Sequence, residues 1–182
     1  MHIIIENKSS LLDSDGRLMV HAIQTLLPIF CSDWNLEVPE LTYLPRTRTH
    51  FFFNPTASFI TITDAKQIGT HPAFHSVENG KPFGTVFAAS ILKQKNPAYA
   101  ISKFLCHEVF EMMLNPKLNR YISGLQAEIC DPVQLNTVLV NGIQLSDWVL
   151  PSWFDSNSKR PYNHNDTLVS PKSIDTGGYI YK

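Results

Sequence analysis

The chain has 182 residues, 43% of them hydrophobic, and a formal net charge of −1 at pH 7. This length and apolar content suit a single domain with a proper core. The near-neutral charge provides no basic field that would hold nucleic acid or an anionic membrane, so we expect neither as a partner. The N-terminus lacks the charged start and long apolar centre of a signal peptide, which predicts a location in the cytoplasm or in a particle assembled there.

The first half of the chain predicts several strands and one helix. Residues 2–6 are β-branched and predict a first strand. Apolar residues at helical spacing predict a helix from 14 to about 31, kinked or ended by Pro28. Further strands or apolar runs are predicted at 36–49 (an edge or irregular strand), 51–53, 58–63 and 84–88. The expected fold class is α+β, with a twisted mixed β-sheet packed on a helix.

A Gly- and Pro-rich stretch lies between two of these predicted strands. Residues 71–84 predict a long loop, and long loops in compact domains are often functional. We expect this loop to close over a site. His75 is the histidine that we bring nearest to that site, with an ordinary loop histidine as the alternative.

The central feature is a helix predicted from about 97 to 115, with Pro97 in its first turn. It carries the pattern His107-Glu108-x-x-Glu111. Each helical residue advances by about 100°, so these polar side chains share one face while the rest of the helix is apolar. Buried carboxylates are unfavourable unless they are paired or bound to a cation. This face therefore predicts metal or proton chemistry inside a cleft.

A short second helix is predicted after a polar turn at 119–124. It carries Glu128 and is closed by Asp131-Pro132. The connection from Glu111 is long enough for the second helix to return antiparallel to the first. The two helices would then bring their acidic side chains together.

These two segments resemble the zincin metallopeptidases. His107-Glu108 resembles the start of the zincin signature, in which a His and a second His one turn later bind zinc and the Glu is the general base. Glu111 stands where the second His would be. The run from Ala127 to Pro132 resembles the third-ligand helix of the gluzincin branch. The resemblance implies a zincin-like fold. It also implies that His107, Glu111 and Glu128 are metal ligands and that Glu108 is the general base. Asp131 would orient the ring of His107 by accepting its other N–H.

The implied ligands leave the identity of the metal open. Two carboxylates and a neutral imidazole neutralise a dication and weaken it as a Lewis acid. The site then suits Zn²⁺, a different divalent metal such as Mn²⁺, Fe²⁺ or Ca²⁺, or no metal. Without a metal, the two helical glutamates would be solvated and His107 would be a hydrogen-bonded core histidine.

The cysteines are odd in number and lie in mainly apolar contexts, which favours reduced, buried thiols over a disulfide framework. They are Cys31, Cys106 and Cys130. The last two neighbour proposed site residues, so a cysteine ligand is the minor alternative.

The last third of the chain predicts a hairpin and a tail. Val138–Val140 and Ile143–Leu145, joined by Asn141-Gly142, carry the strongest hairpin signal. Aromatic residues then give way to a polar, Pro- and Ser-rich stretch. We expect one domain at 1–154 and an extended C-terminal tail at 155–182.

The C-terminal half is also similar to small phage-type proteins. The similarity is carried by the two motifs above, by the run Ser146–Phe154 and by Gly177-Gly178-Tyr179. Two functions follow as hypotheses. One is a metal-dependent hydrolase of the zinc metallopeptidase type, which cleaves a peptide or protein substrate with metal-activated water. The other is a non-catalytic structural or assembly protein of a phage virion, built on a degenerate zincin-like fold, which contacts virion proteins or forms a homo-oligomer. The expected location is the host cytoplasm or the virion.

Overall fold

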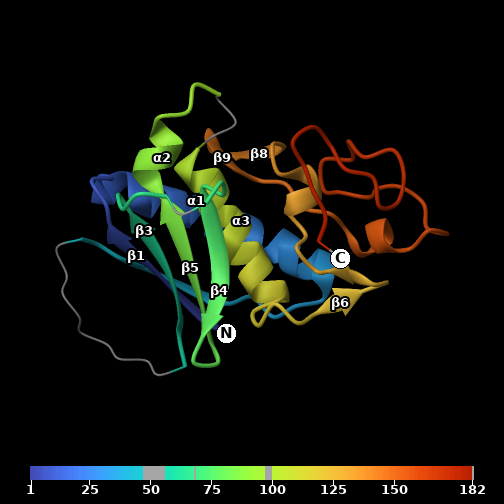
Figure 1. Ribbon diagram of the computed structural model, residues 1–182, viewed down its shortest axis with the longest axis horizontal. Coiled ribbons are helices and arrows are strands. Elements are labelled where there is room, and N and C mark those ends of the chain that lie inside the picture. The colour runs from blue at the N-terminus through green and yellow to red at the C-terminus, as the bar shows by residue number, and fades with distance from the viewer. Residues whose placement is uncertain (47–55, 68, 97–99, 182) are drawn as a thin grey trace.

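The computed structural model describes residues 1–46, 56–67, 69–96 and 100–181. Within them, a five-stranded sheet packs against helix α3 (Figure 1). Its strands are β1 (His2–Lys8), β2 (Glu40–Leu44), β3 (Ser58–Thr63), β4 (Ala73–Glu78) and β5 (Lys81–Phe87). The order is β2-β1-β3-β5-β4, and only the last pair is antiparallel. The predicted α+β class and mixed sheet are confirmed, and β2 is the expected edge strand. The apolar run 51–53 lies outside the described residues.

The helices are α1 (Asp13–Trp34), α2 (Ala88–Leu92) and α3 (Ile101–Leu114). Helix α1 continues through Pro28, so of the two predicted effects of this proline, a kink or an end of the helix, the end is wrong. The apolar face that follows, with Phe30 and Trp34 buried, stabilises the helix by packing, which outweighs the hydrogen bond that a proline removes. Helix α3 begins at Ile101, later than predicted, and the predicted first-turn Pro97 lies outside the described residues.

The predicted loop at 71–84 is instead a hairpin of two strands, β4 and β5. Asn79 and Gly80 form the turn, both with positive φ (51° and 76°), as two-residue hairpin turns require. Pro82 lies within β5, opposite Val77. His75 therefore belongs to an edge strand of the sheet, and its position is set by strand pairing.

The predicted second helix is absent from the described chain. In its place are the short strands β6 (Tyr121–Ile122) and β7 (Leu125–Gln126), joined through Ser123 and Gly124 with positive φ. An irregular segment then carries Glu128, followed by the 3₁₀-helix η1 (Asp131–Val133). Two consecutive residues with positive φ turn the chain into a hairpin before a helix can start.

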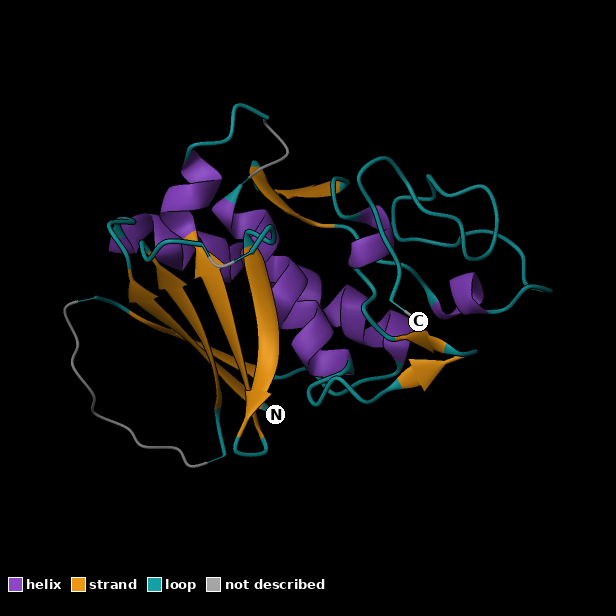
Figure 2. Ribbon diagram, in the orientation of Figure 1, coloured by secondary structure: helices purple, strands orange, loops and turns teal. Residues whose placement is uncertain are grey.

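The C-terminal part begins with the predicted hairpin, which is confirmed as β8 (Thr137–Val140) and β9 (Ile143–Ser146). Beyond it, the described chain is mostly loop, apart from the 3₁₀-helix η2 (Pro151–Phe154) (Figure 2). These loops contribute to the hydrophobic core through buried side chains: Trp148, Trp153, Phe154, Tyr162 and Leu168.

Helix α3 is buried along its whole length, between the sheet and the C-terminal part (Figure 1). Toward the sheet it packs closely at Gly84, where an added Cβ would lie 3.1 Å from Ile60 Cγ1 and 3.4 Å from Met112 Cε. On another face, the Phe110 ring stacks on Phe30 at 4.0 Å, and the Trp148 ring meets both edge-on. This packing leaves the polar face of α3 to point into the protein.

None of the described helices has the length and apolar character needed to cross a lipid bilayer.

Trp148→Ala tests whether the C-terminal part is integral to this core. The indole is fully buried and donates a hydrogen bond to Asp33. Its removal should lower the free energy of unfolding by about 3–5 kcal/mol, measured by urea denaturation. Leu139→Ala is the control, since Leu139 is 68% exposed on β8, and it should change stability by less than about 0.5 kcal/mol. Equal effects of the two substitutions would contradict the packing described.

Candidate metal centre

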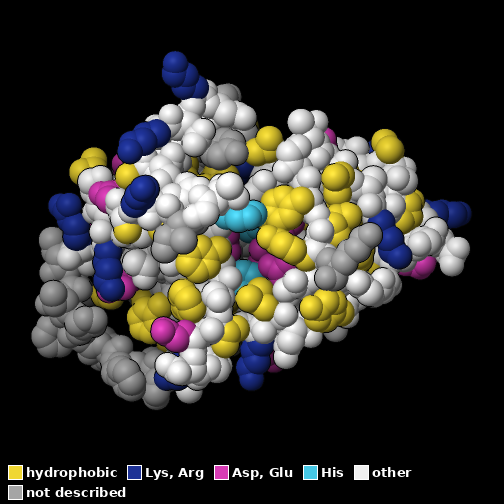
Figure 3. Space-filling view, in the orientation of Figure 1, with side chains coloured by type: hydrophobic (Ala, Val, Ile, Leu, Met, Phe, Trp, Pro, Cys, Tyr) yellow, Lys and Arg dark blue, Asp and Glu magenta, His cyan; other side chains and the backbone are white. Residues whose placement is uncertain are grey.

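A pocket of about 260 Å³ lies beside the polar face of α3. In Figure 3, acidic and histidine side chains gather in a hollow rimmed by hydrophobic side chains. Three imidazoles and four carboxylates line the pocket: His71, His75, His107, Glu108, Glu111, Glu128 and Asp131. Among its described lining residues there is no Lys or Arg to balance the acids. The pocket thus combines metal-ligand side chains with uncompensated negative charge.

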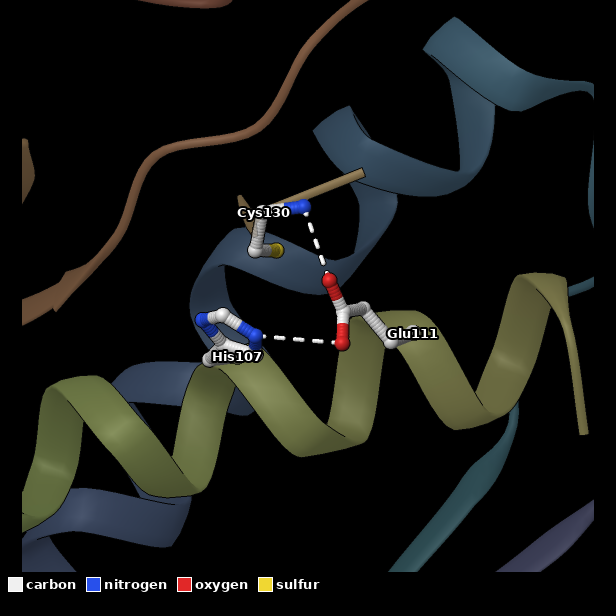
Figure 4. Close-up of side chains that lie close together, drawn as sticks. All are labelled: His107, Glu111 and Cys130. Atoms are coloured by element: carbon white, nitrogen blue, oxygen red, sulfur yellow. Dashed lines mark hydrogen bonds and ion pairs between the residues drawn. The ribbon is translucent and has the colours of Figure 1, made fainter. Parts of the chain in front are cut away.

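His107 and Glu111 lie one turn apart on α3, as the spacing predicts. The His107 Nε2 atom is 3.0 Å from Glu111 Oε2 (Figure 4). The other carboxylate oxygen, Oε1, accepts a hydrogen bond of 3.0 Å from the backbone N–H of Cys130. Helix α3 and the segment after β7 are therefore joined through this one carboxylate.

Asp131 differs from its predicted role. Its Oδ1 atom lies 3.2 Å from His107 Nε2, the same nitrogen that faces Glu111. The other ring nitrogen, Nδ1, has no hydrogen-bond partner among the described residues, and neither has Asp131 Oδ1. The sequence motif predicted that Asp131 accepts the N–H of that other nitrogen. The Asp131 carboxylate instead faces Nε2, together with the carboxylate of Glu111.

His75 enters the pocket from the edge strand β4 and is 7% exposed. Its Nδ1 atom is 3.3 Å from Glu108 Oε2 and 3.9 Å from Glu111 Oε2. Its Nε2 atom is 3.9 Å from Glu128 Oε2. His75 therefore lies among three of the carboxylates.

Glu128 is held in the pocket by a side chain that ends α3. Asn115 Nδ2 donates a hydrogen bond of 2.6 Å to Glu128 Oε1, while Asn115 Oδ1 accepts one from the backbone N–H of Arg120. The segment that carries Glu128 is fixed by further backbone hydrogen bonds, including one from Val149 N to Ile129 O. Glu128 thus reaches the pocket without the predicted helix.

The described residues form two groups of three side chains whose ligand atoms lie within 4.8 Å of one another. One is His107, Glu111 and Cys130, and the other is His75, Glu111 and Glu128. The predicted trio of His107, Glu111 and Glu128 is divided between these groups, which share Glu111. Buried His, Glu and Cys side chains that can hold a metal ion are thus present.

The charges of the pocket favour protonation when no cation is bound. Burial alone would lower the pKa of His75, but Glu108, Glu111 and Glu128 together raise it to about 9. Burial would also lower the pKa of His107, and Glu111 and Asp131 raise it well above its usual value. Burial and the charge of Asp131 raise the pKa of Glu111. A metal entering this pocket would therefore displace protons.

The C-terminal segment supplies one wall of the pocket, which the sequence analysis did not anticipate. The Tyr179 ring packs edge-on against His71 at 5.6 Å, and its backbone N–H donates to the carbonyl of Asp131. A side chain at Gly178 would collide with the carbonyl of Pro132. Burial raises the pKa of Tyr179, so its phenol stays protonated and can donate a hydrogen bond. In the sequence, the Gly177-Gly178-Tyr179 motif is the feature that could have indicated this wall.

Comparison of the chain with protein-family models, with curated proteins and with solved structures found no match.

The pKa of His75 predicts a pH dependence of stability in metal-free protein. Folded His75 keeps its proton up to a pKa of about 9, whereas the unfolded chain releases it near 6.5. The resulting stabilisation, about 3 kcal/mol, is complete below pH 6.5 and is lost as pH rises through 9. Urea unfolding at a series of pH values, with chelator present, measures it.

The matched variants for this measurement are His75→Gln and His21→Gln. The first cannot titrate and should lack this part of the pH slope. The second removes an exposed histidine on α1 and should keep the slope. If the free energy of unfolding changed with pH in the same way in wild type and His75→Gln, the pH-dependent stabilisation would not come from His75.

Proposed function

We propose that this chain is a zincin-like, metal-dependent hydrolase that cleaves peptide bonds. The observation that carries the proposal is the pocket, which four carboxylates and three imidazoles line, with no Lys or Arg among the described lining residues. Buried acids in such number are stable when a cation neutralises them. Metal ligands of these types at these distances are typical of catalytic metal sites.

The cation would be held by His107 Nε2, Glu111 Oε2 and Asp131 Oδ1. The His107 Nε2 atom is 3.0 Å from Glu111 Oε2 and 3.2 Å from Asp131 Oδ1. Ligands bound at about 2 Å in a tetrahedral site lie roughly 3.3 Å apart, so these two separations from His107 fit. Asp131 Oδ1 pairs with His107 Nε2 but accepts no hydrogen bond from the described residues, so it is available as a metal ligand. Cys130 lies in the same group, but burial keeps its pKa well above the usual value, so the neutral thiol is the weaker donor.

Glu108 is assigned as the general base. It is buried on α3 next to His107, lines the pocket and pairs with His75 at 3.3 Å. A cation bound in this pocket supplies Lewis-acid chemistry, since it polarises a carbonyl oxygen and makes water easier to ionise. Glu108 would accept the proton from the attacking water, and His75 would hold the carboxylate in position.

The sheet supports a peptide as substrate. Strand β4 lies at an edge of the sheet in the described chain, and its residues Phe74 and His75 line the pocket. An extended peptide can add to such an edge through main-chain hydrogen bonds. The zincins, which the motif on α3 resembles, bind extended substrate on the edge strand beside the active site. Here the edge strand at the pocket is β4.

The assembly-protein hypothesis has less support. An assembly interface on the C-terminal part would need exposed aromatic side chains that a partner can contact. Trp148, Trp153 and Phe154 are buried in the core of the chain and offer no surface to a partner.

Metal content tests the proposed ligands. Glu111→Gln and His107→Gln should each weaken Zn²⁺ binding by at least about tenfold, because each removes a donor from the site. Calorimetric titration of chelator-treated protein measures the affinity, and circular dichroism checks that each variant is folded. His21→Gln, on the exposed face of α1, should bind like wild type. Unchanged affinity in both pocket variants would rule out the site.

Glu108→Gln separates catalysis from metal binding. The variant should keep its Zn²⁺ affinity, because Glu108 is not among the proposed ligands. It should cleave a library of unstructured peptides about 10²–10⁴-fold more slowly than wild type, since it lacks the base. Mass spectrometry of the peptide products measures the rate. Wild-type cleavage by this variant would refute the assigned role of Glu108.

A further inference from the structure

Glu111 is shared by two groups of ligand side chains, and each group draws on different elements of the fold. His107 and Glu111 come from α3, while Cys130 follows β7. In the second group, His75 comes from β4 and Glu128 from the segment after β7. A metal bound by the first group uses only part of the ligand set that the pocket offers.

We propose that the pocket holds a second divalent cation, bound by His75, Glu111 and Glu128, so that Glu111 bridges two metal ions. This proposal rests on the proposed function, because the first ion is the one held by His107 and Glu111. It assigns His75 and Glu128 to a site of their own.

The hydrogen bonds of the two glutamates prepare them for this role. Glu111 Oε1 is anchored by the N–H of Cys130, which leaves Oε2 3.0 Å from His107 Nε2 and 3.9 Å from His75 Nδ1. Glu128 Oε1 is anchored by Asn115, which leaves its Oε2 3.9 Å from the other ring nitrogen of His75, Nε2. One ligand atom from each of His75, Glu111 and Glu128 lies within 4.8 Å of the other two. Each carboxylate is thus oriented by one oxygen and presents the other to a ligand cluster.

The charge balance favours two ions over one. The four carboxylates that line the pocket carry four negative charges when ionised, and the described lining residues include no Lys or Arg. With one dication, two of these charges must be balanced by protons that the pocket retains. Two dications balance all four with His75 and His107 both neutral, the form in which histidine binds metal.

The size and chemistry of the pocket fit a pair of ions. A cavity of about 260 Å³ has room for two ions and several waters, at roughly 30 Å³ for each water. Paired metal ions in hydrolases lie about 3.5–4 Å apart and act together on the attacking and leaving oxygens. The second group is one imidazole and two carboxylates, a donor set that suits Mn²⁺.

Mn²⁺ loading of the full chain tests the proposal. Chelator-treated protein is dialysed against Mn²⁺, bound metal is counted by mass spectrometry, and electron paramagnetic resonance reports whether the ions are coupled. We expect two ions per chain and the spectrum of an exchange-coupled pair. His75→Ala and Glu128→Gln should each bind one ion and give the spectrum of an isolated Mn²⁺. His21→Ala should keep the coupled pair.

The outcomes separate the two proposals. One ion per chain in wild type overturns the second site. If His75→Ala and Glu128→Gln keep that ion, the first site and the metal-dependent hydrolase stand; if they lose it, the ligands proposed for the first site are also wrong. Two ions in His75→Ala and in Glu128→Gln, with both variants folded by circular dichroism, also overturn the second site. Absence of bound Mn²⁺ and Zn²⁺ from wild-type protein overturns both proposals.

Discussion

Electrostatic repulsion among the buried carboxylates is the constraint on which the candidate site depends. Glu111 has the central position among these carboxylates, because it faces both His107 and His75 and its other oxygen accepts a hydrogen bond from the backbone of Cys130. Without a cation, the raised pKa values of His75, His107 and Glu111 favour protonation of these groups. Protons and metal ions therefore compete for the same place, and metal affinity should rise as pH rises.

The rest of the fold keeps these groups together by packing. Helix α3 is immobilised between the sheet, where Gly84 permits close approach, and an aromatic cluster of Phe30, Phe110 and Trp148. Since every residue of α3 is buried, the helix has little freedom to rotate and relieve the repulsion. Core packing thus maintains an arrangement that its own charges oppose, a common property of sites built for a charged ligand.

Local spacing predicted the half of the site that lies on α3. The placement of His107, Glu108 and Glu111 on one face follows from helical geometry alone. His75 was predicted in a loop, although Asn79-Gly80 is the same hairpin signal that correctly predicted β8 and β9; Pro82 obscured it. The backbone of Glu128 is held by contacts distant in sequence, such as Val149 with Ile129, which no local pattern contains.

The wall formed by Tyr179 has a consequence for the order of biosynthesis. All the other elements that build the pocket precede residue 132, yet Tyr179 and Tyr181 complete its lining. Residues 1–131 already contain all the imidazoles and carboxylates of the lining, so every one of these side chains is synthesised before this last wall. The pocket is complete only when the final segment has docked against His71 and the backbone of Asp131.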